Sequence, residues 1–189
     1  GTNLKLYSDD NPIAADDAFT LSEDAAPQTD NVLANDVDPD QFDSLQIQEG
    51  GGTVDLTGTF IITSNGGRDA EFDIDAAGDL TITLNSAFDD LGVGETDTIT
   101  LEYVAEDLEF GQDNAFVTYT ITGENDAVVG SGDAFVNIDE DTPTASETVT
   151  FFDPDINDVV TLTVINSASN GDEPASFAGL DFLTFLTVT

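Results

Sequence analysis

Short runs of alternating apolar and polar residues dominate the middle of the chain. Residues 80–86 (LTITLNS), 98–107 (TITLEYVAED) and 115–123 (AFVTYTITG) carry apolar side chains at about every second position, with threonine or a charged residue between them. A period of two is typical of a β-strand that buries one face. The pattern therefore predicts a strand in each of the three segments.

Turn signals separate these runs. The segments SNGGRD, DAAGD, GVGE and FGQDN are rich in Gly, Asp and Asn, and we interpret residues 65–69 and 75–79 as hairpin turns. No stretch shows a helical stripe, and the one helix-compatible segment, SEDAAPQTD, is interrupted by Pro27. Many short strands joined by regular turns predict an all-β fold, an antiparallel β-sandwich with Greek-key connections.

An internal repeat organises the chain into two units. The triplet DPD at 38–40 returns at 153–155, Asp43 returns as Asp158, and the pair ED at 23–24 returns at 140–141. The spacing of about 115 residues matches one sandwich domain. We expect a first unit over 9–126 and a second, incomplete unit over 127–189. Residues 1–8 would then be the end of a preceding unit or residues outside the repeat.

The charge balance restricts the partners. The chain has 40 acidic residues, only Lys5 and Arg68 as basic residues, and no histidine, which gives a net charge of −38. Nucleic acids and anionic membrane surfaces require basic patches, so neither is an expected partner. No run reaches the roughly 20 apolar residues of a membrane span, so no direct membrane insertion is expected. Lys5 and Arg68 are too isolated to form an anion site.

The composition nevertheless predicts a packed core. Hydrophobic residues make up 39% of the chain and include 13 Phe, whereas disordered acidic segments have few apolar residues. Self-repulsion at this charge destabilises a compact state unless counter-ions neutralise it. Most of the acids would form a hydrated surface, and the repeated DPD triplet also fits a plain turn composition.

Clustered acids suggest calcium as the counter-ion. Calcium binds six to eight oxygens, and acids at alternate positions of an extended loop can direct theirs to one centre. An EF-hand loop that starts at Asp36 fails, because Gln41 replaces its glycine and Ile47 its final glutamate. In the second unit a loop counted from Asp153 has Val164 at that final position, and the nonapeptide motif GGxGxD is absent.

Strand direction in a sandwich predicts which acids lie at the same end of a unit. The first strand leads away from the incoming linker, so the turn at 23–24 should lie at the far end, near the outgoing linker at 125–126. Glu95 precedes a strand that returns from that end. The DPD loop at 153–155 should lie at the near end of the second unit and face the same linker.

The chain resembles a known repeat family. The segments LGVGETDTITLEYVAED and FVTYTITGENDA, together with the opening NVLANDVDPD, are similar to VCBS-type repeats. These are cadherin-like, immunoglobulin-like modules found in tandem in large secreted bacterial adhesins of the RTX class. The resemblance covers nearly all of the first unit and the first half of the second. It implies tandem Ig/cadherin-like sandwiches stiffened by calcium.

The resemblance also implies the calcium ligands. A cadherin-type site combines a first-strand glutamate, a second glutamate after a leucine-led turn, an Asn-Asp linker and a DxD motif of the next unit. The expected ligands at the outgoing junction are Glu23, Asp24, Glu95, Asn125, Asp126, Asp153 and Asp155, with Asp158 and Glu140 as the repeat counterparts of Asp43 and Glu23. At the incoming end they are Asp10, Asn11, Asp38, Asp40, Asp43 and Asp107. Gly92, Val93 and Gly94 stand where the cadherin turn has an acid before its glutamate, so fewer ions per junction are expected.

Three functions follow from these patterns. The first is a non-catalytic, calcium-binding extender of a bacterial surface adhesin, extracellular and flanked by neighbouring units of the same polypeptide. Such an array would serve cell adhesion and biofilm formation, with host or surface glycans or proteins bound through other domains. The alternative is a glycan- or peptide-binding domain of the same adhesin, although Trp is absent and only three Tyr occur. The third is a fragment of a salt-adapted carbohydrate-active enzyme, because paired carboxylates can hydrolyse glycosides. Absent His and Cys remove the common catalytic bases and nucleophiles, so we predict no enzyme.

Overall fold

A computed structural model describes residues 10–40, 43–49, 58–131 and 150–161. The expectations for residues 1–8, for Glu140 and for most of the second unit lie outside these residues.

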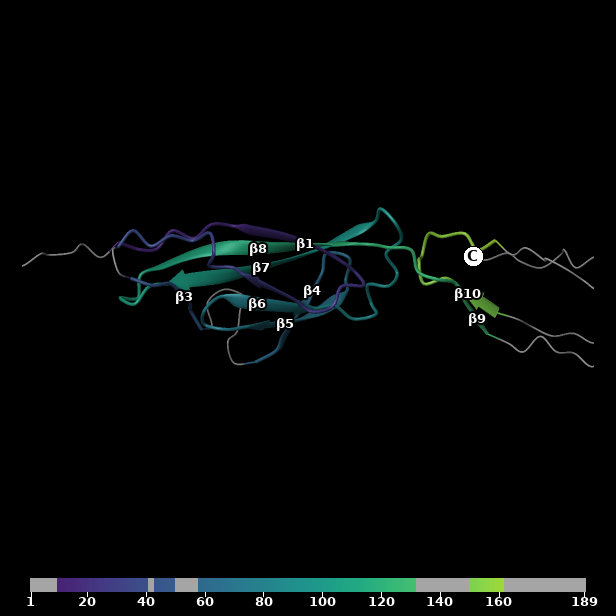
Figure 1. Cartoon of the computed structure of the whole chain (residues 1–189), viewed down its shortest axis with the longest axis horizontal. Coiled ribbons are helices and arrows are strands. Elements are labelled where there is room, and N and C mark those ends of the chain that lie inside the picture. The colour runs from purple at the N-terminus through teal and green to yellow at the C-terminus, as the bar shows by residue number, and fades with distance from the viewer. Residues whose placement is uncertain (1–9, 41–42, 50–57, 132–149, 162–189) are drawn as a thin grey trace, which may run out of the picture. The chain divides into compact units, whose positions relative to one another are not determined.

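Two four-stranded sheets form the first unit (Figure 1). One sheet has the order β1-β8-β7-β3 and the other the order β2-β6-β5-β4. The strands are β1 Asp17–Ser22, β2 Gln28–Asn31, β3 Gln46–Ile47, β4 Phe60–Thr63, β5 Asp69–Ile74, β6 Asp79–Thr83, β7 Thr96–Glu106 and β8 Gln112–Thr122.

The all-β sandwich that the sequence predicts is confirmed, and no helix occurs among the described residues. The chain changes sheet four times, between β1 and β2, between β2 and β3, between β3 and β4, and between β6 and β7, which gives Greek-key connections. One pairing departs from the antiparallel rule, because β1 runs parallel to β8 along the sheet edge. The first strand therefore packs directly beside the last strand of the unit.

Alternating side chains of the central strands fill the space between the sheets. Burial alternates strictly along β5, β6 and most of β7 and β8, as the period of two predicts. The Phe72 ring on β5 lies 5.8 Å from the Tyr119 ring on β8, so aromatic packing joins the two sheets. Burying an aromatic side chain of this size stabilises the fold by about 3 kcal/mol.

The predicted hairpin turns are present. Residues 64–68 join β4 to β5, and residues 75–78 join β5 to β6. Gly67 and Gly78 adopt φ angles of 87° and 85°, in the left-handed region where a side chain is strained. This turn chemistry explains why the two acidic segments are turns.

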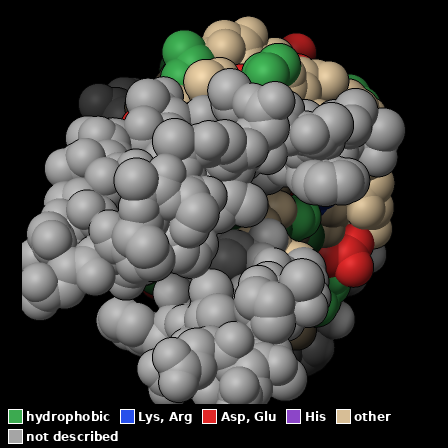
Figure 2. Space-filling model, turned by 90° about the vertical axis from the view of Figure 1, so that its right-hand side faces the viewer, with side chains coloured by type: hydrophobic (Ala, Val, Ile, Leu, Met, Phe, Trp, Pro, Cys, Tyr) green, Lys and Arg blue, Asp and Glu red, His purple; other side chains and the backbone are tan. Residues whose placement is uncertain are grey.

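Residue contacts divide the chain into two compact units. The first ends at Asp126 and also takes in Pro154–Ile156, which the repeat had assigned to the second unit. In the second unit, β9 (Val129–Ser131) pairs antiparallel with β10 (Thr150–Phe152). On the face in Figure 2, hydrophobic side chains lie at the described surface together with acidic ones.

Among the described residues no helix has the length and apolar character needed to cross a membrane.

Candidate metal centre

Both candidate sites lie at the ends of β7. Glu95 directly precedes this strand and Asp107 directly follows it. Because eleven residues of extended chain span about 35 Å, the two ends are well separated. We call the end near Glu95 the C-terminal pole and the end near Asp107 the N-terminal pole of the first unit.

Three acidic side chains converge at the C-terminal pole. Glu23 follows β1, Asp126 follows β8, and Asp155 lies in the segment 154–156 that belongs to the same unit. One carboxylate oxygen from each lies within 4.8 Å of the other two. We call these three residues the Glu23 cluster. It is the one group of three or more acids found this close together in the described part of the chain.

Burial makes the Glu23 cluster unusual for a group of like charges. Glu23 is 5% exposed and Asp155 is 2% exposed. The Glu23 Oε1 atom accepts a hydrogen bond of 2.7 Å from the Glu124 amide, but its Oε2 atom is buried with no hydrogen-bond partner. A buried carboxylate oxygen without a donor is costly unless a cation or a proton satisfies it.

The electrostatics point in the same direction. Burial, with the negative charges of Asp126 and Asp155, raises the pKa of Glu23, although backbone hydrogen bonds from Glu124 and Leu91 oppose the shift. A divalent cation among the three carboxylates would instead lower the pKa of Glu23. Oxygens bound to one Ca²⁺ at 2.3–2.6 Å lie at most about 5 Å apart, which the 4.8 Å separation meets. The donors are all oxygens, so the residues present fit calcium.

The loop between β6 and β7 packs against the Glu23 cluster. A side chain at Gly123 would lie only 2.2 Å from the Leu91 carbonyl oxygen and 2.4 Å from that of Gly92, so glycine is required for this close approach. The Gly123 amide also donates to the Glu95 carbonyl oxygen at 3.0 Å. The loop is thereby fixed to the segment that leads to Asp126.

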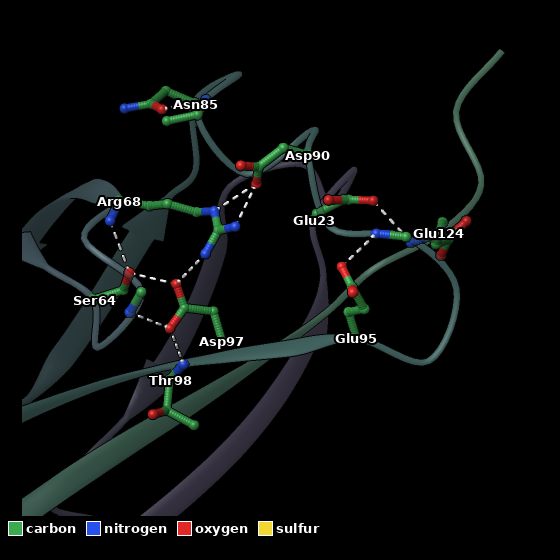
Figure 3. A network of polar contacts seen from close by, with 12 residues as sticks. Glu23, Ser64, Arg68, Asn85, Asp90, Glu95, Asp97, Thr98 and Glu124 are labelled. Atoms are coloured by element: carbon green, nitrogen blue, oxygen red, sulfur yellow. Dashed lines mark hydrogen bonds and ion pairs between the residues drawn. The ribbon is translucent and has the colours of Figure 1, made fainter. Parts of the chain in front are cut away.

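The single arginine of the chain holds this loop (Figure 3). Arg68, in the turn before β5, donates from Nε and Nη2 to Asp90 Oδ1 at 2.6 Å each and from Nη1 to Asp97 Oδ2 at 2.9 Å. Burial alone would raise the pKa of Asp97, but hydrogen bonds from Ser64, Gly66 and Arg68 hold it below its usual range. Figure 3 shows Arg68 between the two carboxylates.

At the N-terminal pole, Asp107 is almost fully buried, with 1% exposed. Its Oδ1 atom accepts the Glu109 amide at 2.9 Å and the Gly111 amide at 2.7 Å, whereas Oδ2 is buried without a hydrogen-bond partner. A side chain at Gly111 would meet Asp107 Oδ2 at 2.2 Å and Asn11 Oδ1 at 3.1 Å. Two oxygens from different segments therefore face the small space above this glycine.

The DPD triplet lies beside the incoming segment. The bridge between Ile13 and Val37 aligns the two segments, and Asp40 Oδ2 accepts the Asp10 amide at 2.7 Å. Asp38 Oδ1 accepts the Asp40 amide at 2.8 Å, and Asp38 Oδ2 is buried without a hydrogen-bond partner. We call Asp10, Asn11, Asp38, Asp40 and Asp107 the Asp107 region. Its acids mostly accept backbone hydrogen bonds in turns.

A third acidic group surrounds the buried Tyr103 hydroxyl. This hydroxyl lies 2.9 Å from the Val32 carbonyl oxygen, 3.1 Å from Asp36 Oδ2 and 3.2 Å from Asp17 Oδ2, yet it has only one proton to donate. Burial raises the pKa of Asp17 to about 6, and it also raises the pKa of Asp36. Protons can neutralise carboxylates here without a metal.

Other predicted ligands lie outside the Glu23 cluster. Glu95 accepts the Gly92 amide at 3.2 Å, Asp24 is exposed, and the Asn125 side chain donates to the Asp126 carbonyl oxygen. Asp158 is exposed, and a hydrogen bond with the Glu109 side chain holds the pKa of Asp43 below its usual range. Asp153 is two residues from Asp155 but not in the cluster, and Glu140 lies outside the described residues.

The sequence analysis missed two contributors to the C-terminal pole. Glu124 supplies the amide that binds Glu23, and its carboxylate accepts the Ser22 hydroxyl at 2.7 Å. Arg68 was judged too isolated for an anion site, but it pairs with two carboxylates of its own chain. The sequence did contain a signal for this pairing. Arg68 is one of only two basic residues in a chain with 40 acids, so it has many potential carboxylate partners.

One family comparison gives a match. The model of the bacterial Ig domain matches residues 9–120, which cover the sandwich of the first unit. None of the curated proteins matches the chain.

Proposed function

Because the chain belongs to the bacterial Ig domain family, we propose that it is a non-catalytic repeat module of a bacterial surface protein that calcium stabilises. The family assignment supports a repeat module, and it carries no catalytic constellation with it. Calcium is the part of the proposal that rests on the residues of this chain.

One observation carries the calcium proposal. The Glu23 cluster brings three carboxylates within 4.8 Å of one another at a place where Glu23 is 5% exposed and its Oε2 atom has no hydrogen-bond partner. The three carboxylates repel one another, and the buried Glu23 Oε2 atom needs a cation or a proton. Calcium prefers carboxylate, amide and carbonyl oxygens, and this pole offers such groups.

Bound calcium would neutralise the repulsion that the three carboxylates now exert. Within the first unit, Glu23 would hold the turn after β1, Asp126 the segment after β8, and Asp155 the segment 154–156. The cation would therefore join three segments of the first unit that are distant in sequence. The Asp107 region is a second candidate, supported by the buried Asp107 Oδ2 atom and the nearby Asn11 Oδ1 atom.

We further propose the setting that the resemblance to VCBS-type repeats implies. The module would be an extender of a large secreted adhesin, extracellular at the bacterial cell surface, and its immediate partners would be neighbouring units of the same polypeptide. Contacts with host or surface glycans and proteins, and a contribution to biofilm formation, would involve other domains. The net charge of −38 argues against nucleic acid as a binding partner.

Thermal unfolding with and without calcium tests the proposal. A ligand that binds only the folded state at 1,000 times its Kd stabilises it by about 4 kcal/mol. We therefore expect the melting temperature in millimolar calcium to exceed that in EDTA by about 10 °C or more. Sodium chloride at matched ionic strength is the control for charge screening. An unchanged midpoint would contradict the calcium proposal.

Calcium titration by calorimetry tests the site itself. We expect Glu23→Gln, Asp126→Asn and Asp155→Asn each to lower the calcium affinity. The matched control is Glu71→Gln, which removes one charge from an exposed position on the outer face of β5. If the control lowers the affinity as much as the cluster variants, calcium binds through the overall charge and the Glu23 cluster is no specific site.

A further inference from the structure

Arg68 holds the loop that lies beside the Glu23 cluster. Its guanidinium joins Asp90, in the loop between β6 and β7, to Asp97 at the start of β7. The Arg68 side chain is 17% exposed and that of Asp97 is 4% exposed. Three nitrogens of one planar guanidinium contact these two carboxylates, which fixes Asp90 relative to Asp97.

The turn that carries Arg68 is itself fixed to the other sheet. The Arg68 amide donates to Ser64 Oγ at 2.9 Å, and the Gly66 amide donates to Asp97 Oδ1 at 2.9 Å. The Asn65 amide donates to the Thr98 carbonyl oxygen at 2.9 Å. These hydrogen bonds therefore fix the backbone of Arg68, and its side chain in turn fixes the position of Asp90.

Asp90 and its neighbour contact the ligand-bearing segments directly. The Asp90 carbonyl oxygen accepts a hydrogen bond of 3.4 Å from the amide of Ile156, the residue that follows Asp155. The Leu91 backbone lies close enough to the Glu23 carboxylate to lower its pKa. Two of the three members of the Glu23 cluster thus depend on where residues 90 and 91 lie.

From this connection we propose that Arg68 is a positioning residue for the calcium site at the Glu23 cluster, an inference that rests on the proposed function. The Arg68–Asp90 pair holds residues 90 and 91 so that Glu23 and Asp155 converge. Without it, Asp90 would be an uncompensated carboxylate in the pole that holds the Glu23 cluster, and repulsion would displace the loop.

The sign of the effect separates positioning from simple electrostatics. A positive charge near a cation site repels the cation, so Arg68→Gln should strengthen calcium binding if charge alone matters. A positioning role gives the opposite result, because the ligands lose their arrangement. We expect Arg68→Gln to weaken calcium binding by about tenfold, which corresponds to about 1.4 kcal/mol.

Arg68→Lys serves as the second variant. It keeps the charge but replaces the planar fork with a single ammonium, which cannot pair with Asp90 and Asp97 in the same way. We expect a loss of affinity with this variant too, and it decides the question if Arg68→Gln fails to fold. Asn31→Ala is the matched control, since it removes side-chain hydrogen bonds to Ala77 and Asp79 at the opposite end of β5 and β6.

Amide hydrogen exchange in calcium-free protein gives a readout that needs no metal. We expect the Arg68 variants to accelerate exchange at Ile156 and Glu124 by tenfold or more, with unchanged exchange at the core residues Ile99 and Val117. Unchanged exchange at Ile156 and Glu124, or calcium affinity equal to or above that of the parent, would overturn the positioning role. If the parent binds no calcium, the proposed function fails, and the exchange rates alone decide whether Arg68 positions the loop.

Discussion

The two poles of the first unit contain similar acids that the fold uses differently. At the C-terminal pole, carboxylates from three separate segments converge in the Glu23 cluster. At the N-terminal pole, Asp38, Asp40 and Asp107 each accept backbone amides within turns or between neighbouring segments. Both poles keep buried carboxylate oxygens without a hydrogen-bond partner, on Glu23 at one end and on Asp38 and Asp107 at the other. The poles therefore differ in that three acids converge only in the Glu23 cluster among the described residues.

This difference shows that the density of acids does not by itself identify a metal site. The segment NDVDPDQFDS has four aspartates in ten residues, yet the Glu23 cluster draws its members from positions 23, 126 and 155. In this segment Asp38 and Asp43 accept amides one or two residues away, whereas Asp40 accepts the amide of Asp10.

The largest expected effect is the loss of calcium-dependent stability at one pole. Of a total gain of about 4 kcal/mol at saturating calcium, Glu23→Gln should remove most and Asp107→Asn the smaller part. Unfolding in urea, with EDTA and with calcium, measures both gains. Equal losses from the two variants would show that the two poles contribute equally to calcium-dependent stability.

The same two positions should behave oppositely without calcium. Asp107→Ala leaves the amides of Glu109 and Gly111 without their acceptor, so we expect the free energy of unfolding in EDTA to fall by about 2–3 kcal/mol. Glu23→Gln keeps an acceptor for the Glu124 amide and removes one repelling charge, so stability should stay within about 0.5 kcal/mol or rise. Urea unfolding in EDTA checks both values. A large loss with Glu23→Gln would show that its carboxylate is already neutralised in the metal-free protein.

The two aspartates of the DPD triplet at 153–155 test which of them binds calcium. Asp153 and Asp155 are two residues apart, and only Asp155 belongs to the Glu23 cluster. We expect Asp155→Asn to lower calcium affinity about tenfold, or about 1.4 kcal/mol, and Asp153→Asn to lower it clearly less. Isothermal titration calorimetry measures the two affinities. A reversed order would place the ion at Asp153.

The smallest expected effect concerns pH and the Tyr103 group. Burial raises the pKa of Asp17 from 3.8 to about 6 in the folded protein, so its protonated form favours folding. Its contribution to stability is present below pH 3.8 and is lost as the pH rises through 6. The neighbouring charges are Asp16, Asp30 and Asp36, and Tyr103 donates to the carboxylate.

Asp17→Asn should therefore flatten the stability profile across this pH range and slightly stabilise the protein at pH 7. Chemical unfolding in EDTA at a series of pH values measures the profile. Glu71→Gln is the control, since Glu71 is exposed on β5 and is not among the charges that raise the pKa of Asp17. An unchanged slope in the Asp17 variant would show that protons do not neutralise this group.

The strands and turns were predictable because they depend on local pattern. The alternation in 98–107 and 115–123 predicted β7 and β8 with ends only a few residues from those observed. The glycines at 67 and 78 predicted the hairpins, since their positive φ angles suit few other residues. The expectation that Glu23 and the 125–126 linker lie at one end follows from strand direction alone.

Tertiary structure decided which side chains meet. No pattern predicts that Arg68, in a turn of one sheet, pairs with Asp97 of the other, or that β1 lies parallel to β8. Glu95 had the same sequence support as Glu23, but its carboxylate accepts the amide of Gly92, three residues earlier. The sequence by itself determined the all-β fold and the acid-rich ends, because the period of two and the positions of the acids can be read along the chain. It also indicated a need for counter-ions, because the net charge depends only on composition. Only the packing of segments distant in sequence decided that Glu23, Asp126 and Asp155 converge, because angstrom-scale proximity of carboxylates depends on how loops pack.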